Sequence, residues 1–247
     1  DHSNDALQYV KYFANHCGQK TIVMEASPGY LGSGMEVAPR IHALIPQTKL
    51  LFILRNPVDR MYSSFNFHVG KLNIRKDMPF SEYIAQCIAY DSGQKSAVEL
   101  GMDEWYLKVI SYGQYAEYLK YYYQCFPTKQ IKIMFFEDMN RDILGFMQEL
   151  CQFLEIPSDY FADYDFKKIN VTYESRLKWL HKMAVWFNAK SERFLRQRPQ
   201  LKQLLVDLYK TANRAREGYG QISAEDYARL QQYYAPSVYS LRVLIEN

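Results

Sequence analysis

The stretch Lys49-Leu-Leu-Phe-Ile-Leu-Arg-Asn-Pro-Val-Asp-Arg-Met-Tyr-Ser-Ser-Phe65 decides the fold of this chain of 247 residues. Its apolar run ends at Arg55, and Asn56-Pro57 then begins a segment whose apolar residues have helical spacing. A continuous apolar run is typical of a strand that is buried on both faces, and a proline is well placed in the first turn of a helix. The stretch therefore predicts a strand over 49–55 followed by a helix over 58–69.

The same alternation of strand and helix patterns fills the first two-thirds of the chain. Short apolar runs at 21–24 and 131–136 predict two further strands. Amphipathic patterns predict helices over 5–15, 36–45, 80–89, 112–125 and 141–155. Because buried strands that alternate with helices form parallel sheets, we predict an α/β fold with helices on both faces of the sheet.

The pattern changes after Pro157. Residues 159–173 have a loop-like composition, and helix patterns then occupy 176–195, 201–216 and 224–245. Ser223 is a good N-cap for the last of these helices because acidic residues follow in the first turn. We predict one domain over 1–247, with an α/β core over 1–157 and a mostly helical lobe over 158–247.

Composition and charge exclude several classes of protein. The 30 Lys and Arg exceed the 27 Asp and Glu by a net charge of only +3, which does not favour a nucleic-acid partner. No apolar run approaches the roughly 20 residues that cross a bilayer. The five histidines have no metal-ligand spacing, so no metal is expected. The four cysteines are scattered, which favours free, buried thiols and a reducing compartment.

Arg55 and Ser63 are the strongest candidates for a binding site. Ligands of open α/β sheets bind beyond the carboxyl ends of the strands, and Arg55 ends the strand over 49–55. A guanidinium there suits a phosphate, and Ser63, two helical turns further on, can offer a hydroxyl to the same anion. The alternative is structural: Arg55 pairs with Asp59, and Ser63 packs against the sheet. Arg60 is interpreted as a surface or ion-pair residue.

Several segments in chain order match one family. They are Glu25-Ala-Ser-Pro-Gly-Tyr30, Glu36-Val-Ala-Pro-Arg-Ile41, Arg-Asn-Pro at 55–57, Gly113-Gln-Tyr115, the strand that leads to Glu137-Asp138, and the C-terminal segment 222–234. This ordered set resembles the sulfotransferases that use 3′-phosphoadenosine-5′-phosphosulfate (PAPS), notably their carbohydrate (heparan-type) and bacterial branches. The resemblance spans nearly the whole chain.

The resemblance implies a P-loop-like sulfotransferase fold and a sulfuryl transfer from PAPS to a hydroxyl or amine, with the nucleotide PAP as product. Carried over by position, Arg55 and Ser63 bind the 3′-phosphate and Arg176 lies near the nucleotide. Glu25 and His68 are candidates for contacts with the acceptor. A carbohydrate is the expected acceptor, and a lipid, a polyketide or another small molecule is the alternative.

The sequence departs from the family pattern at its start. The phosphosulfate loop, typically Lys-x-Gly-Thr-Thr/Ser, is not found, and Ala26 stands where heparan-type enzymes have a lysine. We therefore expect that the first strand, the phosphosulfate loop and the general base lie upstream of Asp1. A catalytically inactive relative that binds nucleotide or glycan is the alternative. A cytoplasmic protein is expected from the free cysteines, with a Golgi-lumen domain cut from its anchor as the other possibility.

Two unrelated functions are the rival interpretations. A nucleotide kinase would need Gly-x-x-x-x-Gly-Lys-Ser/Thr, which the sequence lacks. A helical interaction protein, built on the tyrosine-rich C-terminal lobe, predicts no response to nucleotide.

Overall fold

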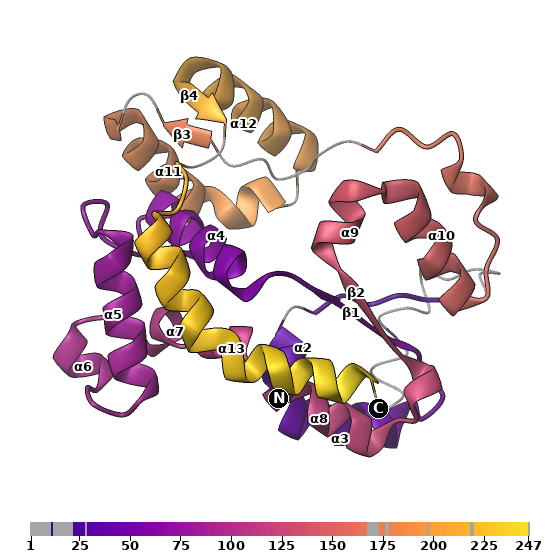
Figure 1. Ribbon diagram of the computed structural model, residues 1–247. Helices are drawn as coiled ribbons and strands as arrows, with labels where there is room; N and C mark the ends of the chain where they lie inside the picture. The colour runs from indigo at the N-terminus through magenta and orange to yellow at the C-terminus, as the bar shows by residue number, and fades with distance from the viewer. Residues whose placement is uncertain are drawn as a thin grey trace.

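A two-stranded parallel sheet lies at the centre of the molecule, and helices surround it (Figure 1). The computed structural model describes residues 11, 22–27, 29–166, 173–175, 178–196, 198–217 and 220–246. β1 (Leu50–Leu54) pairs in parallel with β2 (Ile131–Phe135), so that Leu50 lies opposite Ile131. The predicted parallel pair of strands is confirmed, although helices make up most of the described chain.

Alternate residues of β1 face two different helical layers. Leu54 packs with Leu119 of α8 (Tyr115–Cys125) and Leu241 of α13 (Ala224–Glu246). Leu51, which points to the other face, packs against the cluster that contains Phe146 of α10 (Ile143–Leu154). The expected arrangement, with helices on both faces of the sheet, is therefore present.

Nine further helices lie among the described residues: five are at or near predicted positions, and the four short ones at 29–32, 97–100, 104–107 and 136–141 were not predicted. They are α2 (Gly29–Gly32), α3 (Gly34–Leu44), α4 (Pro57–Gly70), α5 (Phe80–Asp91), α6 (Ala97–Leu100), α7 (Glu104–Leu107), α9 (Phe136–Arg141), α11 (Lys178–Arg196) and α12 (Pro199–Asn213), with short 3₁₀ turns at Ser111–Gly113, Thr128–Gln130 and Asp159–Phe161. Pro57 lies in the first turn of α4, as predicted, and Asn56 is the N-cap of this helix. Within the described ranges, no helix is long and apolar enough to cross a membrane.

The structure corrects the predicted helices at three places. The helix expected over 141–155 is interrupted at Asp142, whose carboxylate accepts the Gly145 N–H at 2.9 Å and so starts α10 anew. The helix expected over 112–125 begins only at Tyr115, after a 3₁₀ turn. The helix expected over 201–216 ends at Asn213, because the next four residues form a strand instead.

That strand, β4 (Arg214–Glu217), pairs antiparallel with β3 (Tyr173–Ser175), whose first residue closes the segment interpreted as a loop. The sequence Arg-Ala-Arg-Glu favours a helix locally, so pairing with a distant segment overrides its propensity. Of the strand expected over 21–24, residue 21 lies outside the described residues, and Ile22–Met24 are not in a strand. Their side chains are exposed, and no strand of the described residues pairs with them, as a ladder would require.

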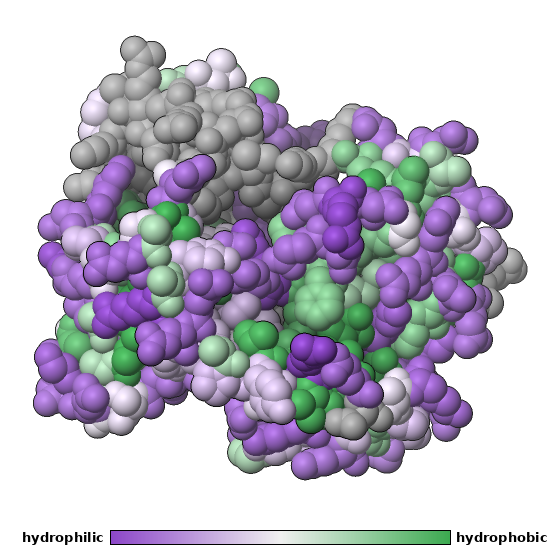
Figure 2. All heavy atoms as spheres, viewed as in Figure 1, coloured by the Kyte–Doolittle hydropathy of each residue, from purple (hydrophilic) through white to green (hydrophobic). Residues whose placement is uncertain are grey.

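Apolar side chains also remain exposed on the sheet itself. Ile53 of β1 and Phe135 of β2 are both exposed. The space-filling view shows an apolar area on the right half of the viewed face, where α13 ends (Figure 2). The helices therefore do not cover every apolar side chain near the strands.

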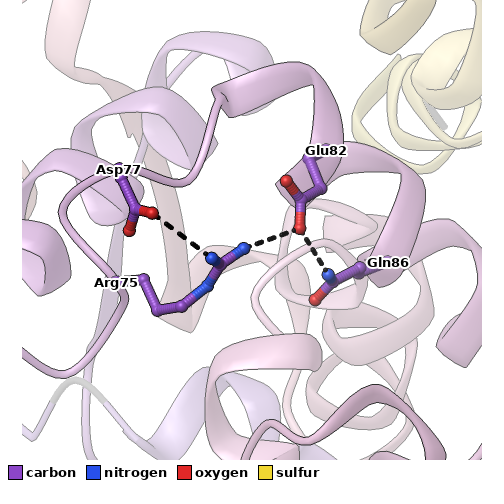
Figure 3. A network of polar contacts seen from close by, with 4 residues as sticks. All are labelled: Arg75, Asp77, Glu82 and Gln86. Carbon is purple, nitrogen blue, oxygen red and sulfur yellow. Dashed lines mark hydrogen bonds and ion pairs between the residues drawn. The ribbon is translucent and has the colours of Figure 1, made fainter.

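The largest core cluster lies between α4, α5, α7 and α13, away from the sheet. Its fully buried members include Met61, Tyr83 and Leu230. In the loop that joins α4 to α5, the exposed Arg75 side chain donates to Asp77 and to Glu82, and so links the loop to α5 (Figure 3). Cys87, in the same cluster, is a free thiol whose pKa burial raises to about 12, so it is an unreactive part of the core.

Candidate functional site

The turn between β1 and α4 is fixed by contacts from three directions. The Tyr115 hydroxyl donates to the Arg55 carbonyl at 2.8 Å. The Asn56 N–H donates to the Glu137 carboxylate at 2.9 Å. The Asn56 side chain accepts the Val58 N–H at 2.9 Å and so caps α4. These bonds connect the residues that follow β1 with α4, α8 and α9 at the carboxyl end of the sheet, where ligands of α/β folds bind.

The Arg55 side chain is held in place but not neutralised. Its guanidinium lies over the Phe136 ring, 5.0 Å from the centroid. In the described part of the chain, no carboxylate is within ion-pair distance of it, and the Asp59 pairing that sequence analysis left open is not formed. A half-buried cation of this kind is able to receive an external anion.

Ser63 lies on the side of α4 that does not pack into the core. The core residues of this helix are Val58, Met61 and Phe65, and Ser63 is rotated by about 160° from both Met61 and Phe65. It is half-buried, and its hydroxyl has no hydrogen-bond partner among the described residues. The face of α4 that packs into the core is therefore not the face that carries Ser63.

Arg60, expected to be a surface or ion-pair residue, is half-buried and forms no ion pair among the described residues. Its guanidinium is half-buried and donates to the Val109 carbonyl, while its Nε is buried without a partner among the described residues. Burial raises the pKa of Tyr115, and the positive charge of Arg60 opposes that rise. Arg60 thus adds positive potential behind the turn at Arg55.

The Gly113-Gln-Tyr115 element connects this turn to α13. A Cβ at Gly113 would lie 2.7 Å from the Tyr234 ring, so only glycine permits the contact. Gln114 donates to the Tyr233 hydroxyl at 2.9 Å, and Tyr115 holds Arg55 as described above. Each residue of the element therefore makes a different contact: Gly113 with the Tyr234 ring, Gln114 with the Tyr233 hydroxyl and Tyr115 with the Arg55 carbonyl.

Glu25 organises the segment before α3. One of its carboxylate oxygens accepts the Ser27 hydroxyl at 2.7 Å and the Tyr30 hydroxyl at 2.8 Å. The Tyr122 hydroxyl donates to the Tyr30 carbonyl at 2.7 Å, which ties the segment to α8. Burial and the bond to Glu25 both raise the pKa of Tyr30, so its hydroxyl stays a donor.

His68 lies at the opposite end of α4 from Arg55. It follows Pro57 by eleven residues, which corresponds to about 16 Å along the helix axis. Its ring packs edge-on against Phe67 and Tyr106, and burial lowers its pKa. Arg55 directly precedes the Asn56 cap of α4, Ser63 lies in the middle of that helix, and His68 lies five residues beyond Ser63. Arg176 lies outside the described residues.

The residues that bind the turn at Arg55 and Asn56 from distant parts of the sequence were not predicted. Tyr115 and Glu137 were quoted only as parts of motifs, and Tyr227, whose hydroxyl accepts from Asn56 at 3.4 Å, was not singled out. The only signal for them was their place at the start of a helix or the end of a strand. Within the described ranges, no group of three His, Cys, Asp or Glu side chains is arranged to hold a metal ion.

Comparison with known proteins gives one family. A family model described as "Sulfotransferase domain" matches residues 37–200. The bifunctional heparan sulfate N-deacetylase/N-sulfotransferase of Drosophila melanogaster is 29% identical over 156 residues, which is 61% of this chain and 14% of that protein. The bifunctional heparan sulfate N-deacetylase/N-sulfotransferase 1 of Caenorhabditis briggsae is 22% identical over 146 residues, which is 59% of this chain and 16% of that protein.

One further protein and one solved structure are also similar to this chain. Sulfotransferase 2A6 of Rattus norvegicus is 22% identical over 109 residues, 44% of this chain and 32% of that protein. All three alignments therefore span less than a third of the relative's own length. The crystal structure of a sulfotransferase from Alicyclobacillus acidocaldarius matches with a TM-score of 0.61 and 22% identity, covering 98% of this chain and 72% of that one. This last match supports the fold.

Proposed function

Because the chain belongs to the sulfotransferase family, as the match over residues 37–200 shows, we propose that it moves a sulfuryl group from PAPS to a hydroxyl or amine of a carbohydrate. The observation that carries the proposal is the Arg55 guanidinium: Arg55 directly follows β1, and its side chain has no carboxylate partner in the described chain. A fixed cation at a strand end is suited to a phosphate group of a nucleotide.

The proposed nucleotide contacts are Arg55 and Ser63, with Arg176 as a third. The Arg55 fork suits two phosphate oxygens, and the half-buried Ser63 hydroxyl has no hydrogen-bond partner among the described residues, so it can donate to the same group. Both belong to elements that are fixed by the turn at Asn56, so the two donors are positioned before the nucleotide binds. PAPS supplies the sulfuryl group, and the residues of this chain position it.

Sulfuryl transfer, like phosphoryl transfer, depends mainly on positioning and on stabilising charge. Tyr115, Glu137 and Asn56 hold the Arg55 backbone, which makes them positioning residues in the proposal. On the acceptor side we assign Glu25, whose carboxylate already accepts two hydroxyl groups. His68, whose ring packs against Phe67 and Tyr106, is the second residue proposed for the acceptor side.

The acceptor class rests on the relatives. Two of the proteins that this chain resembles are named for the N-sulfation of heparan sulfate, a carbohydrate that offers amine groups. The resemblance covers 61% and 59% of this chain, and the family model matches residues 37–200, which include the strand and helix around Arg55. A glycan amine or hydroxyl is therefore the proposed acceptor.

A thermal-shift titration with adenosine 3′,5′-bisphosphate tests the donor site, with 5′-AMP as the control ligand. A ligand that binds only the folded state stabilises it by about 2.7 kcal/mol at one hundred times its dissociation constant. We expect a shift with the bisphosphate alone, which Arg55→Ala and Ser63→Ala both reduce. The matched controls are Arg75→Ala, an exposed arginine, and Ser64→Ala, the neighbouring serine. Equal shifts with both nucleotides would contradict the 3′-phosphate site.

A second assay separates transfer from binding. With PAPS labelled in its sulfuryl group, we expect label on a partially de-N-acetylated glycan and none on neutral lipid. Label on lipid alone would overturn the acceptor assignment. If the full-length protein binds the bisphosphate but puts no label on any acceptor, it is an inactive nucleotide-binding relative, which the alanine at position 26 favours.

A further inference from the structure

The segment 178–213 differs in charge from the rest of the chain. It forms α11 and α12, which pack against each other and are called here the α11–α12 hairpin. The hairpin contains eight Lys and Arg against two Asp and Glu, a net charge of +6. The remaining 22 Lys and Arg and 25 Asp and Glu give the rest of the chain a net charge of −3. An asymmetry of this kind indicates an anionic partner.

α11 presents an apolar face to solvent. Trp179, Met183, Trp186, Phe187 and Phe194 are all exposed, and their spacing of i, i+4, i+7, i+8 and i+15 places them on one side of the helix. Trp179 is 60% and Trp186 is 64% exposed. Side chains of this size are normally covered, so this face is available for a contact outside the described chain.

α12 repeats the arrangement with aliphatic residues. Leu204, Leu205 and Leu208 are exposed on one side of the helix. Among the side chains that the structure describes in the hairpin, Leu195 alone is buried. Figure 1 shows the hairpin at one end of the molecule, away from β1 and β2. Most of the large apolar side chains that the structure describes on these two helices are therefore exposed.

Cationic side chains lie on and beside the apolar faces. Lys190 follows Trp186 by one helical turn and is exposed on the same side of α11. Arg196 and Arg198 are exposed where the two helices join, and the Arg198 guanidinium lies 4.2 Å from the centroid of the Phe194 ring. Long basic side chains next to apolar ones can extend toward phosphate groups while the apolar groups enter hydrocarbon.

We propose that the α11–α12 hairpin docks on the surface of an anionic lipid bilayer, with its apolar faces among the headgroups and its cations on the lipid phosphates. Basic charge, a one-sided apolar face and indole rings are together typical of helices that lie in the plane of a membrane interface. The 19 residues of α11 offer a contact about 28 Å long, and α12 widens it. This proposal is independent of the reaction that the protein catalyses.

Vesicle co-sedimentation of the full chain tests the docking. We expect binding to phosphatidylcholine vesicles that contain about one third phosphatidylglycerol, and at least tenfold weaker binding to phosphatidylcholine alone. We expect high salt to weaken the binding, because the Debye length falls from about 8 Å at 0.15 M to about 3 Å at 1 M. Binding that is equal with and without anionic lipid would overturn the proposal.

Tryptophan fluorescence tests which residues enter the interface. Two of the three tryptophans lie on α11, and Trp105→Phe leaves these two as reporters. We expect their emission to shift to the blue on anionic vesicles and to be quenched by lipids brominated in the acyl chain. Vesicle binding without either change would show that the contact is purely electrostatic. It would overturn the proposal that the apolar face enters the bilayer interface.

A pair of matched substitutions assigns the contact to the hairpin. Trp186→Glu is expected to reduce vesicle binding at least tenfold, whereas Trp105→Glu, at a tryptophan that is 58% exposed on α7, is expected to leave it unchanged. Circular dichroism checks that both variants are folded. An equal loss in both variants would overturn the proposal. The proposal would also be overturned if the native chain bound no vesicle and Trp186→Glu converted a dimer into a monomer. In that case the apolar face would join two copies of the chain.

Discussion

The turn after β1 and the α11–α12 hairpin use large side chains in opposite ways. Around the turn, Tyr115 and Tyr234 are almost fully buried, and each hydroxyl donates to a backbone carbonyl at 2.8 Å. In the hairpin, Trp179 and Trp186 remain mostly exposed. Buried and paired side chains fix the position of a backbone, whereas exposed ones contribute little to folding and remain available for binding. The same chain thus contains a rigid site and an external surface.

The largest expected difference comes from truncating one side chain in each region. Tyr234→Ala removes a ring that is 1% exposed, together with its bond to the Ile110 carbonyl, and should lower the free energy of unfolding by about 4 kcal/mol. Leu208→Ala, in the hairpin, should change it by less than about 0.5 kcal/mol. Urea unfolding followed by circular dichroism measures both. Similar losses in the two variants would show that the hairpin is part of the core.

A smaller effect is expected where two helices of the rigid region approach closely. A Cβ at Gly34 would lie 2.7 Å from the Tyr118 carbonyl oxygen of α8, so Gly34→Ala must push α3 away. The expected loss is about 1–3 kcal/mol, or about 2–4 °C in Tm for each kcal/mol. Gly29→Ala is the matched control, because nothing lies within 4 Å of its Cβ position. A Tm for Gly34→Ala as high as that of the control would contradict the tight contact.

The smallest effect concerns pH and the far end of α4. Burial lowers the pKa of His68 below its usual value near 6.5, so the folded protein favours the neutral ring. The stability that depends on neutral His68 is therefore present above about pH 6.5 and is lost as the pH falls through the lower, folded pKa. His68→Gln should flatten the decline of Tm between about pH 7 and pH 5. An unchanged decline would mean that other groups cause it.

Local sequence was sufficient for the elements that carry the candidate site. The apolar run over 50–54 predicted β1, and the proline at 57 predicted where α4 begins. The eight-residue spacing of Arg55 and Ser63 predicted a shared place for both, since a strand end and the next helix are neighbours in sequence. These features depend on residues a few positions apart, which is the range over which propensity and capping act.

Distant contacts were beyond such reasoning. The bond from Tyr115 to the Arg55 carbonyl joins residues 60 positions apart, and no local pattern marks that tyrosine among the 22 of the chain. The pairing of β3 with β4 likewise overrides a helical sequence. Ile22–Met24 have the composition of a strand, but a strand needs a hydrogen-bonded neighbour, which the sequence of one segment does not specify.

The hydrogen bond between Asn56 and Tyr227 has a consequence for synthesis on the ribosome. The two residues are 171 positions apart, so the Asn56 turn emerges long before its partner on α13 exists. At about 5–20 residues per second, the delay is roughly 10–30 s. During that time the turn lacks Tyr227, and the nascent β1 and α4 lack the cover of Leu241 and Tyr234. The nascent chain should therefore be a client of ribosome-associated chaperones until α13 has been released.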